Sequence, residues 1–119
     1  MMGESKRIIL LIAILLIVLL GYQFYYKKSD DFGSATVSWN QSEEPDLAGY
    51  KIYYGVAPRT GDCPNGSSYS YNVDVGNVVS YTFDRLENNK TYYFSVSAYD
   101  TSGNESCFSD EVKKTILLD

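Results

Sequence analysis

The stretch Ser80–Asp100, SYTFDRLENNKTYYFSVSAYD, decides the fold of this chain. Its second half places apolar side chains at every second position, at Tyr92, Phe94, Val96 and Ala98. Such alternation is typical of a strand with one buried face. Between the two halves lies ENNK, a run of turn-forming residues at 87–90. The stretch therefore predicts two antiparallel strands joined by a tight turn.

The same period of two recurs on both sides of this stretch. The segments with alternating apolar residues are 35–40, 50–54, 69–75, 80–86, 91–99 and 112–117. Loops rich in Gly, Pro, Asn and charged residues separate them, and no helical period follows residue 28. Six short strands at hairpin spacing predict an all-β fold, an antiparallel β-sandwich.

Several segments carry a resemblance to one family: Trp39, DLAGYKIYYG at 46–55, the stretch Ser80–Asp100, and SGNES and SDEV at 102–106 and 109–112. Together they resemble a fibronectin type III domain of the prokaryotic surface-protein type. Leu86 and Tyr92, with five residues between them, are similar to the family's tyrosine corner, in which the Tyr hydroxyl bonds the backbone just upstream. The fold-defining core is then expected at Trp39, Tyr50, Ile52, Leu86, Tyr92, Phe94, Val96 and Ala98.

The resemblance also implies that the strand which normally precedes Ala35 is missing or vestigial. The strand at 35–40 is then an exposed sheet edge that a partner strand can join. Tyr53 and Tyr93 alternate outward on neighbouring strands. The candidate partner surface therefore comprises Ala35, Val37, Tyr53 and Tyr93.

The N-terminal region contains Ile8–Leu20, thirteen consecutive residues without a polar side-chain atom. Because the apolar residues leave no polar face on a helix, this segment is expected to lie in a membrane. The predicted organisation is a cytoplasmic N-terminus at 1–7, a transmembrane helix at 8–26, a short stem at 27–34 and the domain at 35–119. The membrane-anchor residues are Ile8, Leu11, Leu15, Leu19, Tyr22, Tyr25 and Tyr26.

An uncleaved signal anchor competes with two other interpretations of this segment, a cleaved signal peptide and a pilin-like assembly helix. The charges that flank the segment are balanced and give little guidance on orientation. Both cysteines lie downstream of it, which favours an extracytoplasmic C-terminal domain, either periplasmic or at the cell surface.

Composition narrows the function classes. Residues 29–119 carry six Lys or Arg and fourteen Asp or Glu, a net charge of about −8 that disfavours nucleic acid as a partner. The chain has no histidine, and the sequence has no pattern of a nucleophile with its base or of a metal cluster. We therefore expect a protein that is not an enzyme and needs no cofactor.

Cys63 and Cys107 are the two cysteines, and an extracytoplasmic pair favours a disulfide. Cys63 lies in the long loop at 56–68, nominally at the opposite end of the sandwich from Cys107, so two free or intermolecular thiols remain an alternative. An acidic end of the sandwich is a weaker calcium candidate, with ligands at Glu43, Glu44, Asp46, Asp100, Ser102, Asn104 and Glu105. Asx-turn chemistry explains the same residues.

These observations predict a single-pass membrane protein that presents a fibronectin type III-like domain close to the outer membrane face. We expect it to serve as a protein-interaction or accessory subunit of a larger membrane or envelope assembly. Its partners are then membrane lipid, through the helix, and other membrane or envelope proteins. Carbohydrate binding or adhesion through the outward tyrosines is the alternative, and a pilin-like filament subunit is a lesser one.

Overall fold

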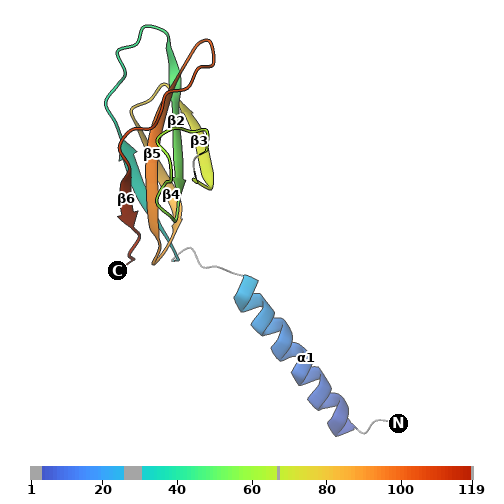
Figure 1. The fold of residues 1–119 in the computed structure, drawn as a ribbon. Coiled ribbons are helices and arrows are strands. Elements are labelled where there is room, and N and C mark those ends of the chain that lie inside the picture. The colour runs from blue at the N-terminus through green and yellow to red at the C-terminus, as the bar shows by residue number, and fades with distance from the viewer. Residues whose placement is uncertain (1–3, 26–30, 67, 119) are drawn as a thin grey trace. The chain divides into compact units, whose positions relative to one another are not determined.

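The computed structural model describes residues 4–25, 31–66 and 68–118 (Figure 1). They belong to two compact units, Met1–Asp31 and Phe32–Asp119. The first unit contains one helix, α1 (Glu4–Tyr25). The second contains the strands β1 (Phe32–Ser38), β2 (Leu47–Gly55), β3 (Tyr71–Gly76), β4 (Ser80–Glu87), β5 (Thr91–Asp100) and β6 (Val112–Thr115). The domain therefore begins at Phe32 rather than at the predicted Ala35.

Helix α1 contains the whole apolar run Ile8–Leu20, and the large side chains of this run are 51–69% exposed. Within the part of the chain that the structure describes, no helix is long and apolar enough to cross a membrane. The predicted transmembrane helix at 8–26 is thus not supported. The predicted interfacial tyrosines, Tyr22, Tyr25 and Tyr26, lie outside the residues whose side chains are described.

The predicted antiparallel β-sandwich is confirmed. Its described strands form a two-stranded sheet, β1-β4, and a four-stranded sheet in the order β3-β2-β5-β6. All four sheet pairings are antiparallel. In Figure 1, β3 and β6 lie at opposite edges of the larger sheet with β2 and β5 between them. The start of β1 and the C-terminus lie at the same end of the domain.

The core lies between the two sheets, because alternate residues of the paired strands β2 and β5 face the same side. Tyr50, Ile52 and Tyr54 are opposite Ala98, Val96 and Phe94 in the register. The buried members of the core are Ala35, Val37, Tyr50, Ile52, Phe83, Leu86, Tyr92, Phe94, Val96 and Ile116. Trp39 and Ala98 are half-buried and pack against them. All eight residues of the expected core are thus part of this cluster or in contact with it.

The hydroxyl of Tyr92 accepts a hydrogen bond of 3.0 Å from the backbone N–H of Glu87, five residues upstream. This bond holds the connection between β4, in the smaller sheet, and β5, in the larger one. The turn between them continues into the C-terminal segment, since Asn89 N–H donates to the Ile116 carbonyl and Ile116 N–H to the Lys90 carbonyl. The last strand therefore ends at Thr115, earlier than the predicted Leu117.

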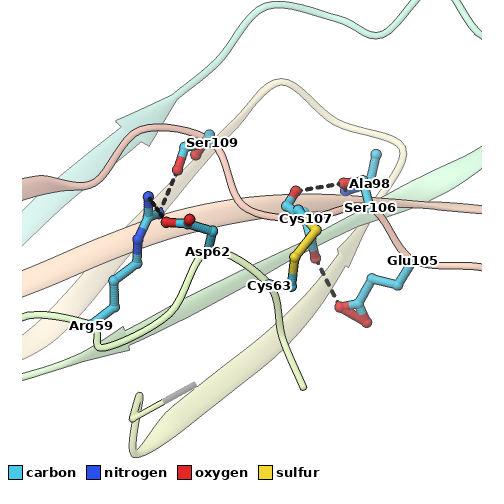
Figure 2. The surroundings of a disulfide bond; sticks show 9 residues. Arg59, Asp62, Cys63, Ala98, Glu105, Ser106, Cys107 and Ser109 are labelled. Atoms are coloured by element: carbon cyan, nitrogen blue, oxygen red, sulfur yellow. Dashed lines mark hydrogen bonds and ion pairs between the residues drawn. A yellow bond between two sulfur atoms is a disulfide. The ribbon is translucent and has the colours of Figure 1, made fainter. Parts of the chain in front are cut away.

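A disulfide joins Cys63 and Cys107, as the cysteine pair predicted. The segment after β2 and the segment before β6 lie side by side there, and Phe108 N–H donates to the Asp62 carbonyl at 2.7 Å. Figure 2 shows Arg59 and Asp62 beside the disulfide, with the Arg59 guanidinium bonded to the Ser109 carbonyl at 2.6 Å. The segment after β2 is long enough to fold back along the sheet. Cys63 therefore reaches Cys107, although strand order nominally places the two cysteines at opposite ends of the sandwich.

We predict that Tyr92→Phe lowers the free energy of unfolding by about 1–2 kcal/mol, because it leaves the Glu87 N–H without its acceptor. Tyr93→Phe is the matched control, since the Tyr93 hydroxyl has no hydrogen-bond partner among the described residues. Urea unfolding in mild detergent, followed by the fluorescence of the single tryptophan, Trp39, measures both. Equal effects of the two substitutions would contradict the role of Tyr92.

Replacing both Cys63 and Cys107 with alanine is predicted to cost about 3–4 kcal/mol, because the disulfide closes a loop with a sequence separation of 44. The same unfolding experiment checks this value. Wild-type protein treated with a phosphine reductant should match the double variant. A reduced protein as stable as the oxidised one would show that the loops hold together without the disulfide.

Candidate functional site

The sequence predicted an exposed tyrosine surface on the outer face of the four-stranded sheet. In the structure, Phe108 and Tyr69 pack over part of this face. Tyr53 lies on this face, and the rings of Phe108 and Tyr69 pack against it at centroid distances of 5.0 and 6.5 Å. Phe108 precedes β6 and Tyr69 precedes β3. The disulfide holds together the two segments that supply these rings. The exposed tyrosine surface predicted at Tyr53 and Tyr93 is therefore not found, because both residues are half-buried and the Tyr53 ring packs against Phe108 and Tyr69.

A polar network fills the space beneath these segments. Glu105 accepts hydrogen bonds from the Tyr53 hydroxyl (2.7 Å) and the Ser97 hydroxyl (3.0 Å) and forms an ion pair with Lys51 (3.3 Å). The Tyr69 hydroxyl contacts Glu111 and the Ser95 hydroxyl. Ser95 and Ser97 are only 1% exposed. Because each buried hydroxyl has a partner, this face of the sheet is closed by satisfied contacts.

The environment of the two phenols raises their pKa values. Burial, followed by the hydrogen bond to Glu105 and its negative charge, raises the pKa of Tyr53 to about 12. Burial and the hydrogen bond to Glu111 likewise raise the pKa of Tyr69 to about 12. An ordinary phenol is already protonated at physiological pH, so these shifts extend the range over which both hydroxyls donate to more alkaline pH. Their contacts with carboxylates tie the covering segments to the sheet.

The acidic end of the sandwich forms a hydrogen-bonded turn. The Asp100 carboxylate accepts bonds from the backbone N–H groups of Ser102 and Asn104, both at 2.9 Å, and from the Asn104 side chain at 3.0 Å. These bonds lower the pKa of Asp100. Within the described residues, no group of three or more His, Cys, Asp or Glu is placed to hold a metal ion. Asx-turn chemistry accounts for this loop.

The edge of β1 differs from the partner surface predicted there. Ala35 and Val37 are 3% and 7% exposed, so their side chains are core and not contact surface. Their burial follows from alternation, which turns Thr36 and Ser38 outward instead. Among the described strands β1 has one neighbour, β4, so the main chain along its other side has no strand partner. The open feature is thus the backbone edge of β1.

Beside this edge lies the seam between the two sheets, which we call the β1–β6 seam. Two overlapping grooves of about 360 and 240 Å³ run along it, and both are lined by Val37, Phe94 and Val112. Val112 belongs to β6 and is 53% exposed. Val37 and Phe94 are only 7% and 1% exposed, so Val112 supplies most of the apolar surface of the seam.

Two lysines stand on the β6 side of the seam. Lys114 donates a hydrogen bond of 3.0 Å to the Ser34 carbonyl and so links β6 to β1. Neither Lys113 nor Lys114 has an acidic partner among the described residues. Asp110 lines the other of the two grooves. The basic part of the seam is thus the groove at Lys113 and Lys114, in a domain of net charge about −8.

The opposite seam, between β3 and β4, holds an aromatic groove that sequence reasoning missed. It has a volume of about 300 Å³ and is lined by Tyr54, Tyr71, Tyr81 and Phe83, among others. The period of two along 69–75 and 80–86 places Tyr71 and Tyr81 on the inward side of their strands, yet they are 57% and 37% exposed. Both strands are sheet edges, so a side chain that points inward from them reaches the open flank of the sandwich. The high tyrosine content of the sequence could have indicated this groove, whereas the spacing of the tyrosines along the strands could not.

Comparison with known proteins agrees with this architecture. A sequence model described as the fibronectin type III domain matches residues 28–115. A Kelch domain-containing protein of Saccharolobus solfataricus is 36% identical over 73 residues, which are 61% of this chain and 9% of that protein. The crystal structure of the chicken CNTN1 FN1-FN3 domains superimposes with a TM-score of 0.56 at 24% identity, over 73% of this chain and 28% of that one.

The chain therefore spans only a small part of the curated relative and of the solved structure that it matches. The similarity to the chicken protein shows the fold alone. The family model, in contrast, covers well over half of the chain, including both sheets and the tyrosine corner. On this ground the chain belongs to the fibronectin type III domain family.

Proposed function

We propose that this chain is a protein-interaction module that binds an extended segment of a partner polypeptide along β1. Membership of the fibronectin type III family indicates a protein-interaction or adhesion module. One observation carries the finer proposal, namely the unpaired edge of β1 beside an open seam. The proposal assigns no catalytic role to the chain. In support, the carboxylates of Glu105 and Glu111 are engaged by buried hydroxyls.

Strand addition suits this edge for two physical reasons. An unpaired strand offers main-chain N–H and C=O groups that a second chain can bond. The seam beside it offers apolar surface to the partner's alternate side chains chiefly through Val112, which is 53% exposed beside the buried Val37 and Phe94. An added strand would thus gain main-chain bonds and apolar contacts together.

The charges at the seam indicate the charge of the partner segment. Lys113 and Lys114 line the seam, and neither has an acidic partner among the described residues. A partner segment that carries Asp or Glu at positions facing β6 complements them. The remainder of the domain is acidic and repels other acidic segments, which restricts such a partner to the seam.

Membrane attachment through the N-terminal helix belongs to the same proposal. It is supported by the sequence, in which Ile8–Leu20 has no polar side-chain atom, and by the exposure of these side chains on α1. Apolar surface of this extent requires an apolar environment. A membrane supplies that environment, and the extracytoplasmic orientation predicted from the cysteines is retained. Partners that reside in the same membrane or envelope follow from this location.

Val112→Asp is predicted to abolish assembly, because it removes apolar surface from the seam and places a negative charge where the acidic partner segment would lie. Val56→Asp is the matched control, since Val56 is 54% exposed and lies in the segment after β2. Native gels of mild-detergent extracts should show wild type and the control in a large complex and Val112→Asp outside it. In the purified complex, hydrogen exchange should reveal new protection of the amides of β1. A complex without that protection would contradict strand addition.

The membrane component has its own test. The wild-type protein is predicted to stay in the membrane pellet after alkaline carbonate extraction. A double variant with Leu11→Lys and Leu15→Lys is predicted to appear in the supernatant. Two charges in the apolar run cost about 5–7 kcal/mol of insertion free energy. Release of the wild-type protein by carbonate would show that the helix does not insert in the membrane.

A further inference from the structure

We propose that the aromatic groove between β3 and β4 binds a proline-rich segment in the polyproline II conformation that carries a basic residue. This site lies at the opposite seam from the β1 edge and does not depend on strand addition there. Its ligand is inferred from four properties of the groove, which are the tilt of its rings, its unpaired hydroxyls, its length and its charge.

The rings of the groove are inclined to one another and form no flat platform. The Tyr54 ring contacts those of Tyr71 and Phe83 at centroid distances of 5.4 and 4.6 Å, with interplanar angles of 31° and 54°. Tyr81 meets Phe83 at 4.9 Å and 73°. Since these rings are in contact, a ligand lies on the exposed rings, Tyr71 and Tyr81, and not between the pairs. A sugar ring stacks best on one flat aromatic face, so this uneven surface favours the separate pyrrolidine rings of a proline run.

Three phenol hydroxyls at the groove are unpaired. Tyr54, Tyr71 and Tyr81 have no hydrogen-bond partner for their hydroxyls among the described residues, whereas the Tyr92 hydroxyl is bonded to Glu87. The rings of the three tyrosines are connected by direct contacts, from Tyr71 to Tyr54 and through Phe83 to Tyr81. A polyproline II segment has no internal hydrogen bonds, and its carbonyl groups are free to accept from such donors. Aromatic-lined grooves with donors are the usual receptors for this conformation.

The groove follows β4 along its length. Residues 81–87 all line it, which corresponds to roughly 20 Å of strand at about 3.3 Å per residue. Its volume of about 300 Å³ is at the small end of ligand sites, so the groove is long and narrow. That shape fits an extended chain better than a compact ligand.

The charges at the groove define the flanking residue. Asp84 is exposed, lines the groove and has no partner among the described residues. Arg85 also lines the groove, and its guanidinium lies over the Phe32 ring at 4.8 Å. A Lys or Arg next to the proline run therefore has Asp84 as its acceptor. The net negative charge of the domain supports the same preference.

The test is fluorescence anisotropy with full-length protein in mild detergent and a labelled decaproline peptide that ends in two arginines. Replacing both Tyr71 and Tyr81 with alanine should weaken binding at least about tenfold, because aromatic anchors dominate such contacts. Replacing both with phenylalanine keeps the rings and should cost several-fold, which isolates the hydroxyls. Tyr93→Ala, on the other face of the sheet, is the matched control and should bind as wild type does.

Asp84→Asn should weaken binding of the arginine-bearing peptide about twofold to fivefold and leave plain decaproline unaffected, as for an exposed ion pair. Val112→Asp, which disrupts the β1–β6 seam, should bind the peptide normally. The loss of one binding site can thus be distinguished from the loss of the other. Thermal unfolding verifies that each variant is folded. The proposal is overturned by lack of peptide binding to wild-type protein, by an equal loss in Tyr93→Ala, or by binding of a chito- or cello-oligosaccharide in place of the peptide.

Discussion

Two strands cover one face of a sheet of four in the described domain, and this unequal pairing determines which surfaces are open. The apolar residues of β2 and β5 fill the middle of the larger sheet, where β1 and β4 lie over them. The edge strands β3 and β6 have no strand opposite them. Because a sandwich core is only as wide as its narrower sheet, apolar and aromatic side chains remain accessible at both lateral seams. The candidate binding sites follow from this one constraint.

The outer face of the larger sheet is closed by a different means. Two long segments fold back over it, and the Cys63–Cys107 disulfide joins them. Beneath them, Glu105 and Glu111 receive hydrogen bonds from tyrosine hydroxyls at strand and loop positions. A sheet face that is often solvent-exposed in antiparallel folds is here covered by the chain itself. The surfaces left for partners are therefore the seams and not the face.

The two seams differ in chemistry although both arise from the same geometry. The β1–β6 seam combines a main-chain edge, aliphatic side chains and two lysines. The β3–β4 seam combines inclined aromatic rings, unpaired phenols and Asp84. An acidic β-strand segment suits the first and a basic proline-rich segment the second. Lys113 and Lys114 at the first seam and Asp84 at the second favour partner segments of opposite charge, so the two proposed partners would not compete for one site.

The sequence by itself determined the strands, the family resemblance and the expected core, because period-two alternation reports directly which side of a strand is buried. It also determined the apolar character of Ile8–Leu20 and the potential for a disulfide. Only the tertiary structure decided that Tyr53 is covered and that Tyr71 and Tyr81 are open. Alternation assigns a side chain to one of two faces, but the cover over each face comes from segments distant in sequence. The fold-back of the segment around Cys63, fixed by Cys107, is such a contact, and no local pattern encodes it.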